Sequence, residues 1–159
     1  MTETAISIRQ ATASDVPTIV DLYNVLYHDD GRLRDHTLEP EWANAHGAAY
    51  FETVVTGASS TCFLAELGQD SVGYLIAHFH EPNDFRRVAL AELESMTVRP
   101  AWRRRGVGGA LAQAFFSWAR ERHAAELRVT AYATNHDAIA FYRSLGFTPH
   151  QVTLQQTLT

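Results

Sequence analysis

A short turn rich in glycine and arginine, placed between a strand and a helix, limits the folds open to this chain. The β-rich run 88–98 is stopped by Pro100, and residues 99–106 form a basic turn. Residues 107–123 then carry apolar side chains at helical spacing. A helix N-terminus has unpaired N–H donors and about half a positive charge, and glycines let an anion approach its backbone. The turn therefore predicts a cradle for a phosphate group, most simply a pyrophosphate.

Two other phosphate-binding turns do not fit this segment. A Walker loop needs a lysine after its glycines, whereas every basic residue of this chain is arginine and lysine is absent. A dinucleotide fingerprint needs a third glycine where Leu111 stands, and it lies early in its domain. The alternative to a phosphate-binding turn is an ordinary helix N-terminus, in which the glycines allow close packing and the arginines are solvated.

The rest of the chain alternates between strand-like and helix-like patterns without internal repeats. The expected strands are residues 5–9, 61–67, 72–79, 88–98, 126–133 and 147–158, and the expected helices are 16–27, 41–55, 107–123 and 135–145. A polar loop is expected over residues 28–40. This order predicts an α/β (α+β) fold with a mixed sheet of six or seven strands and about four helices.

Composition excludes several classes of protein. With 159 residues, 46% of them apolar, we expect a single domain over residues 1–159. The net charge of −5 argues against a nucleic-acid partner. Cys62 is the only cysteine, so an internal disulfide and a cysteine-rich zinc site are excluded, and the histidine spacing indicates no metal. Without a signal peptide or a membrane-length apolar run, we expect no membrane partner and a cytoplasmic location.

Two motifs resemble the GCN5-related N-acetyltransferase (GNAT) superfamily. The spacing Arg103-x-x-Gly106-x-Gly108 is similar to its acetyl-CoA signature, Gln/Arg-x-x-Gly-x-Gly/Ala. Residues 135–147 resemble its segment Asn-x-x-Ala-x-x-x-Tyr-x-x-x-Gly-Phe, and residues 8–15 resemble its first strand and turn. The likeness spans nearly the whole chain. It is weakest at residues 28–55 and 80–87, which shape the acceptor site in that family.

The resemblance implies acetyl-CoA as co-substrate, no metal, and a mostly antiparallel sheet that splays between its fourth and fifth strands. Backbone N–H groups from Arg104 to Gly109 would hold the pyrophosphate, with help from the Arg103 and Arg104 side chains. The pantetheine arm would pair with the backbone of Met96 and Val98, as an added strand does. The implied cofactor-binding residues are Met96, Thr97, Val98, Arg103, Arg104, Arg105, Gly106, Val107, Gly108, Gly109, Asn135 and Tyr142.

The implied reaction is N-acetylation of a primary amine, on a small molecule or a peptide, by direct attack in a ternary complex. An alkyl ammonium, with a pKa of about 10, must first lose a proton, and a carboxylate can relay that proton. Glu92 and Glu94 stand two apart on one strand and so point to the same face. Glu92 is similar in position to the family's base, and Glu94 is the alternative. Tyr142 matches the tyrosine that protonates the leaving thiolate.

Several questions stay open at the level of sequence. Instead of acting in catalysis, Glu92 and Glu94 would be solvated strand residues, and Tyr142 would be an aromatic side chain packed between helix and sheet; the sequence leaves both interpretations open. A non-catalytic acyl-CoA-binding regulatory module is the competing function, and it would bind acetyl-CoA without releasing thiol. The acceptor is not defined, because carboxylates and arginines are both present in the variable segments. Many members of the family are homodimers, and no sequence feature here decides the oligomeric state.

Overall fold

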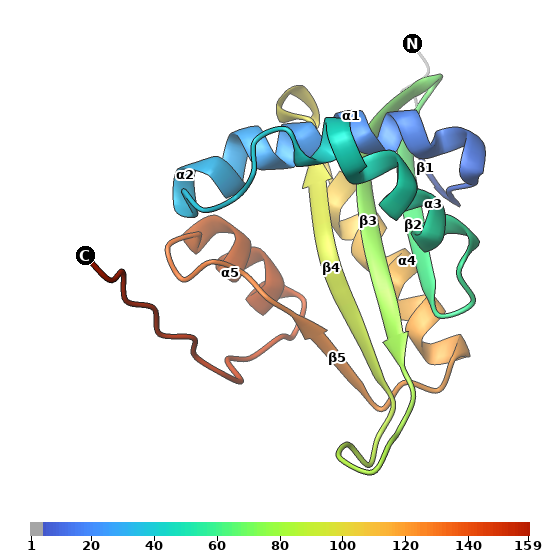
Figure 1. Cartoon of the computed structure of the whole chain (residues 1–159). Coiled ribbons are helices and arrows are strands. Elements are labelled where there is room, and N and C mark those ends of the chain that lie inside the picture. The colour runs from blue at the N-terminus through green and yellow to red at the C-terminus, as the bar shows by residue number, and fades with distance from the viewer. Residues whose placement is uncertain (1–4) are drawn as a thin grey trace.

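The computed structural model describes residues 5–159, in which five strands form one mixed sheet (Figure 1). The strand order β1-β2-β3-β4-β5 follows the chain. β1 to β4 pair antiparallel with one another, whereas β5 pairs parallel with β4. The bounds are β1 Ile6–Gln10, β2 Ser60–Leu67, β3 Asp70–His80, β4 Leu90–Val98 and β5 Glu126–Val129. The α/β class and the mixed, mostly antiparallel sheet predicted from the sequence are confirmed.

Helices cover both faces of this sheet. The α-helices are α1 Val16–Leu26, α2 Arg32–Arg34, α3 Ala48–Thr56, α4 Val107–Glu121 and α5 His136–Ser144. One face of the sheet packs against α4, and the opposite face packs against α1 and α3 (Figure 1). Within residues 5–159, none of these helices combines the length and apolar character needed to cross a bilayer.

The core is built by the alternation of side chains along the central strands. Phe63 and Leu75 lie on the α4 face beside Phe115. Leu64 and Ile76, one position further along each strand, lie in the core of the α1 and α3 face. Because both faces of β2 and β3 are buried, both strands carry continuous apolar runs instead of an alternating pattern.

The strand count differs from the prediction of six or seven. Residues 147–158, expected to be a strand, lie outside any strand, and β5 ends at Val129 instead of at residue 133. A strand exists only where a neighbouring backbone supplies hydrogen-bond partners. Within residues 5–159 no hydrogen bond reaches residues 148–159, and β5 ends where β4 diverges from it.

The predicted splay between the fourth and fifth strands is present. β5 pairs with β4 only over Leu90–Leu93, and among residues 5–159 no strand pairs with the rest of β4 on that side (Figure 1). The register between β3 and β4 also shifts here, since Ser95 pairs with Ile76 while Leu93 pairs with Ala77. Glu94 is therefore the extra residue of a β-bulge. Bulges of this kind redirect a side chain and are common beside active sites.

The segment between α1 and α3 contains more helical structure than expected. The predicted polar loop over residues 28–40 begins with a π-helical turn at Tyr27–Gly31, which continues into α2. The predicted helix over residues 41–55 begins with a second π-helical turn at Ala43–Gly47. Each turn buries a glycine, Gly31 or Gly47, so the wider turns bring the backbone close to neighbouring side chains.

Candidate active site

In the part of the chain that the structure describes, no strand pairs with the backbone groups on the open side of β4. The N–H of Arg99 donates to the carbonyl of Val72 at 2.8 Å, so this residue's backbone faces β3. Backbone groups of successive strand residues point to opposite sides. Thr97 therefore also faces β3, while Met96 and Val98 face the gap left by β5. The carbonyl of Val98 accepts a hydrogen bond from Arg103 Nε at 2.8 Å.

The turn after β4 presents backbone donors to open space. Gly106 caps α4 with a φ of +82°, and no side chain caps that helix end. The first N–H groups of α4 therefore lack intrahelical partners. A Cβ added at Gly106 or Gly109 would meet no atom within 4 Å, and one at Gly108 would meet only the Phe141 ring, at 3.4 Å. The space before this helix end thus suits a bound anion.

The three arginines of the turn have different partners. Arg103 donates through a terminal guanidinium nitrogen to Asp29 Oδ2 at 2.6 Å. Arg105 stacks on the Trp102 ring, with its guanidinium carbon 5.1 Å from the ring centroid. Arg104 has a φ of +62° and forms no ion pair or side-chain hydrogen bond within residues 5–159. Its charge is therefore available to a ligand, whereas the Arg103 charge is shared with Asp29.

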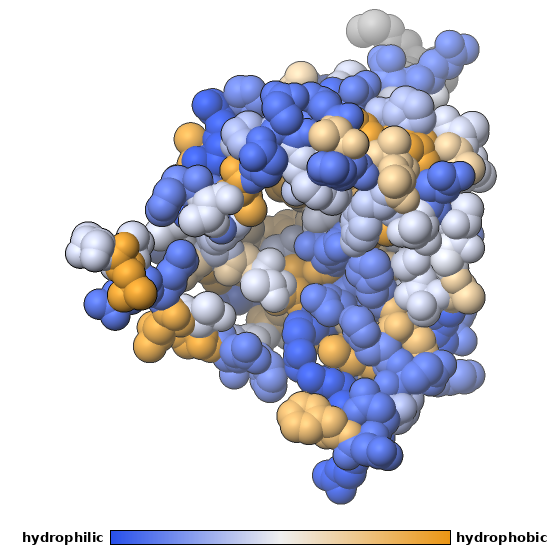
Figure 2. Space-filling view, viewed as in Figure 1, coloured by the Kyte–Doolittle hydropathy of each residue, from blue (hydrophilic) through white to orange (hydrophobic). Residues whose placement is uncertain are grey.

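The start of α5 is joined to the segment before α2. Asn135 caps α5, because its Oδ1 accepts from the N–H of Ala138 at 3.1 Å. Its Nδ2 donates to Asp30 Oδ1 at 2.9 Å, and Arg34 bonds both Asp30 and the Thr134 hydroxyl. Figure 2 shows the surface hollowed between α2 and α5, over the gap between β4 and β5. These bonds link the two sides of that hollow.

Tyr142 contributes a protonated phenol to this region. It lies on α5, edge-on to the rings of Phe141 and Phe147 at centroid distances of 5.3 and 5.9 Å. Burial, with a smaller effect from the carboxylate of Asp30, raises the pKa of Tyr142 to about 12. The hydroxyl therefore keeps its proton at neutral pH and is able to donate it.

The two strand carboxylates lie on one face, as their spacing predicts, but they differ in their surroundings. Glu94 accepts a hydrogen bond from Tyr50 Oη, and its Oε1 lies 3.4 Å from His78 Nε2. The hydrogen bond to Glu94 raises the pKa of His78, although partial burial opposes it. Burial and Glu94 together raise the pKa of Tyr50. Within residues 5–159, the one side-chain partner of Glu92 is His80, whose Nε2 lies 3.0 Å from Glu92 Oε2.

Sequence reasoning left three of these residues without a role. The sequence motifs assign no catalytic or binding role to His78, His80 or Tyr50, and Asp29 enters the sequence analysis as one of the carboxylates of the variable segments. One signal in the sequence points to the histidines, because they repeat at the same two-residue spacing as Glu92 and Glu94 on the next strand. In the described part of the chain, no three His, Cys, Asp or Glu side chains converge as a metal ion would require.

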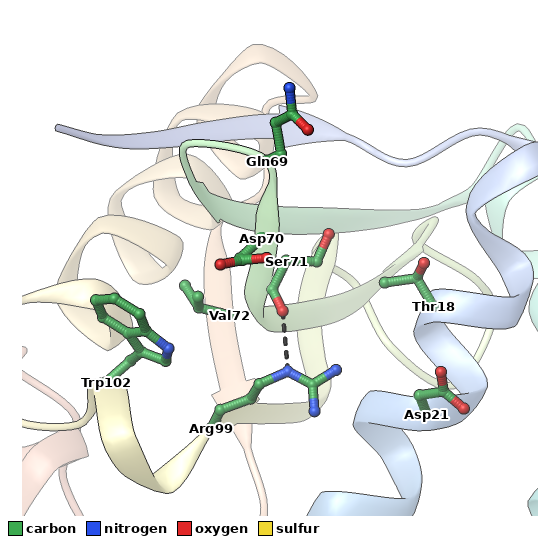
Figure 3. Close-up of a pocket in the computed structure, with 8 residues that line it drawn as sticks. All are labelled: Thr18, Asp21, Gln69, Asp70, Ser71, Val72, Arg99 and Trp102. Atoms are coloured by element: carbon green, nitrogen blue, oxygen red, sulfur yellow. Dashed lines mark hydrogen bonds between the residues drawn. The ribbon is translucent and has the colours of Figure 1, made fainter. Parts of the chain in front are cut away.

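A separate polar pocket of about 410 Å³ lies between the β2–β3 turn and α1. Figure 3 shows Arg99 across from Asp21, with its Nε donating to the carbonyl of Ser71 at 3.0 Å. This bond ties the end of β4 to the hairpin. This hydrogen bond therefore helps to position the start of the glycine-rich turn. Its other lining residues are Thr18, Gln69, Asp70, Val72 and Trp102.

Comparison with known proteins agrees with this arrangement. Residues 19–147 match the model of the Acetyltransferase (GNAT) family, and the chain belongs to that family. The matched region includes β4, the glycine-rich turn and α5.

The relatives found by comparison differ considerably from this chain in sequence. The chain is 29% identical over 148 residues to an aminoglycoside N(6′)-acetyltransferase type 1 of Stenotrophomonas maltophilia, covering 92% of this chain and 89% of that protein. It is 25% identical over 146 residues to an uncharacterized N-acetyltransferase of Methanocaldococcus jannaschii, covering 92% of this chain but 62% of that protein. An aminoglycoside N-acetyltransferase solved in complex with CoA has the same fold, with a TM-score of 0.75, 18% identity and coverage of 96% and 95%.

Proposed function

We propose that this chain is an acetyl-CoA-dependent N-acetyltransferase that acetylates a primary amine of a small molecule in a ternary complex. The observation that carries this proposal is the open side of β4. Backbone of Met96 and Val98 that no strand within residues 5–159 pairs lies there, near the turn that leads into α4, and α5, which carries Tyr142, lies across the gap (Figure 1). A cleft with these three features suits an extended, phosphate-bearing thioester better than it suits a peptide or a nucleotide base.

The residues fit coenzyme A by their chemistry. The N–H groups at the start of α4 would bind the pyrophosphate, and the free Arg104 side chain would add a positive charge. Met96 and Val98 would pair with the amide groups of the pantetheine arm. The side-chain amide of Asn135 already bonds Asp30 through its nitrogen and Ala138 through its oxygen. Asn135 would therefore contact the pantetheine arm only by giving up its hydrogen bond to Asp30.

The proposed proton path uses one group on each side of the gap between β4 and β5, Glu94 on β4 and Tyr142 on α5. Bound acetyl-CoA supplies the thioester carbonyl that the neutral amine attacks, forming the C–N bond and breaking the C–S bond. Glu94 takes the proton of the incoming ammonium, and its contacts with Tyr50 and His78 hold the carboxylate in place. Tyr142 donates its proton to the leaving sulfur. We choose Glu94 over Glu92 as the base because two side chains, Tyr50 and His78, hold Glu94, whereas His80 is the single partner of Glu92 within residues 5–159.

A small cationic amine is the acceptor that we propose. Glu92 and Glu94 place two carboxylates on the face that α3 covers, where they attract an ammonium group. The names of the relatives agree with an amine on a small molecule. An aminoglycoside is the first acceptor to test, followed by polyamines and a peptide α-amine.

Thiol release from acetyl-CoA, measured with this panel of amines, tests the function. We expect amine-dependent release by the parent chain. A regulatory module would instead gain thermal stability with acetyl-CoA and release no thiol with any amine. Tyr142→Phe should keep its affinity for coenzyme A and lose about 10²–10⁴-fold in turnover.

Paired glutamine variants test the choice of base. Glu94→Gln should reduce the rate more than Glu92→Gln, and most strongly at low pH, where the acceptor is most fully protonated. Glu121→Gln removes the same charge at the far end of α4, on the opposite face of the sheet, and should leave the rate unchanged. A larger loss in Glu92→Gln would move the base to that residue.

A further inference from the structure

The polar pocket between the β2–β3 turn and α1 has no part in the proposed reaction. It has a volume of about 410 Å³ and lies on the β3 side of β4, whereas the gap assigned to acetyl-CoA opens on the β5 side. Arg99 lines the pocket and follows Glu94 by five residues along the chain, which separates the two by roughly 16 Å at about 3.3 Å per residue. A ligand in this pocket would thus occupy a site apart from both reaction substrates.

Arg99 presents a cationic fork to this pocket. Its Nε donates to the carbonyl of Ser71 at 3.0 Å, and this bond fixes the direction of the half-buried guanidinium. Within residues 5–159, neither terminal nitrogen forms a hydrogen bond or an ion pair, and Figure 3 shows the guanidinium turned toward α1. Two free terminal nitrogens are able to bind a carboxylate through parallel hydrogen bonds. The pocket therefore holds a prepared receptor for a carboxylate.

Asp21 of α1 provides the opposite charge on the far side of the same space. Figure 3 shows its carboxylate across from Arg99, and the two side chains form no ion pair. By contrast, Arg9 on β1 contacts both Asp15 and Glu66 at 2.8 Å. Opposite charges that stand apart across a pocket suit a ligand that carries both charges, a carboxylate for the guanidinium and an ammonium group for the aspartate. An α-amino acid carries these two groups on one carbon.

A second carboxylate, that of Asp70, lies at the hairpin end of the pocket. Figure 3 shows Asp70 on the side of Trp102 and Asp21 on the side of α1, with Arg99 between them. The lining therefore carries one positive and two negative charges. This set of charges repels a phosphate or a dicarboxylate and favours a ligand with one net positive charge. A cationic side chain on the amino acid would supply that charge and meet Asp70.

We propose that this pocket binds a free α-amino acid with a cationic side chain, such as lysine. Arg99 binds the α-carboxylate, Asp21 binds the α-ammonium group, and Asp70 binds the ammonium group of the side chain. The hydroxyls of Thr18 and Ser71 line the same space and form no hydrogen bond within residues 5–159, so they are free to bond the ligand.

The indole signals in nitrogen–proton correlation NMR spectra of the full-length protein locate bound L-lysine. Trp102 lines the pocket, and Figure 3 shows its indole nitrogen on the side facing Arg99. Trp42 lies beside Tyr50, with ring centroids 5.7 Å apart, and Tyr50 donates to Glu94, so Trp42 reports on the acceptor side. Titration with L-lysine, without acetyl-CoA, should shift the Trp102 signal in a saturable manner. A saturable shift of Trp42 with no shift of Trp102 would overturn the proposal.

Two analogues of lysine separate the contributions of its charged groups. Cadaverine lacks the α-carboxylate and should bind at least about tenfold more weakly, because the charge-assisted hydrogen bonds from Arg99 are lost. L-Norleucine lacks the side-chain ammonium group and should bind about 1.4- to 5-fold more weakly, as expected for the loss of an exposed ion pair with Asp70. If cadaverine shifted the Trp102 signal at the same concentrations as lysine, the role of Arg99 would be wrong.

Single substitutions test the assigned residues. Asp21→Asn removes the partner of the α-ammonium group and should weaken L-lysine binding about 1.4- to 5-fold. Arg99→Gln should weaken it at least about tenfold, with circular dichroism to show that the variant folds without the bond to Ser71. Glu121→Gln removes one charge at the end of α4, on the opposite face of the sheet, and should bind lysine as the parent does. A parent without a saturable Trp102 shift, or equal weakening by Asp21→Asn and Glu121→Gln, would overturn the proposal, whereas neither result bears on acetyltransferase activity.

Discussion

We expect Asp29 to compete with a phosphate of coenzyme A for the Arg103 guanidinium, so replacing Asp29 by asparagine should tighten coenzyme A binding. A terminal nitrogen of Arg103 lies 2.6 Å from Asp29 Oδ2, and the side chains are 42% and 36% exposed. Arg103 is also held by the Val98 carbonyl at the end of β4, so it stands at the mouth of the open gap. In the free protein, Asp29 in the turn Tyr27–Gly31 is the negatively charged partner of Arg103.

The magnitude follows from the exposure of the pair. Exposed ion pairs contribute about 0.2–1 kcal/mol. Coenzyme A must displace this contact before Arg103 can bind phosphate, so its removal should tighten binding about 1.4- to 5-fold. Loss of the carboxylate also removes repulsion toward the phosphates, and both effects should shrink as salt is added.

Isothermal titration of coenzyme A into Asp29→Asn, at low and at high salt, measures this effect. Glu81→Gln is the matched control, because it removes one negative charge in the β3–β4 loop, far from the turn. Weaker binding by Asp29→Asn would refute the reasoning, since Asp29 would then orient Arg103 for the ligand. Equal tightening by both variants would also refute it, because the effect would then come from net charge.

Three further predictions concern the turn, His78 and the absence of lysine. Gly108→Val should weaken coenzyme A binding sharply while global stability changes far less, because a larger side chain fills the space before α4; parent-like binding by calorimetry would contradict this. The raised pKa of His78 favours its protonated form in the folded state, so its stabilisation is complete below the unfolded value of about 6.5 and is lost as pH rises through the folded value. Urea unfolding should therefore show that His78→Gln costs more stability at acidic than at alkaline pH; an equal cost at both would exclude this linkage. Because the chain has no lysine, prolonged incubation with acetyl-CoA should add at most one stable acetyl group, at the α-amine, and two hydroxylamine-resistant groups by intact mass would disprove this.

Local chemistry explains the features that could be predicted from the sequence alone. The strand, the glycine-rich turn and the start of α4 are encoded within about sixteen consecutive residues, and glycine at residue 106 adopts the left-handed conformation that the turn requires. Asn135 caps α5 for an equally local reason, since its side chain bonds an N–H three residues later. The shared face of Glu92 and Glu94 follows from the two-residue period of a strand.

Tertiary structure decided which partners these residues meet. The register of β3 against β4, with its bulge at Glu94, brings His78 to that carboxylate, and the packing of α3 brings Tyr50 to it. Asp29 reaches Arg103 from 74 residues away in the chain, which no local pattern encodes. The C-terminal segment shows the same limit most clearly. Its alternation of apolar and polar side chains is local and predicts a strand, but a strand also needs a second backbone to pair with, and only the arrangement of the whole molecule determines whether one is present.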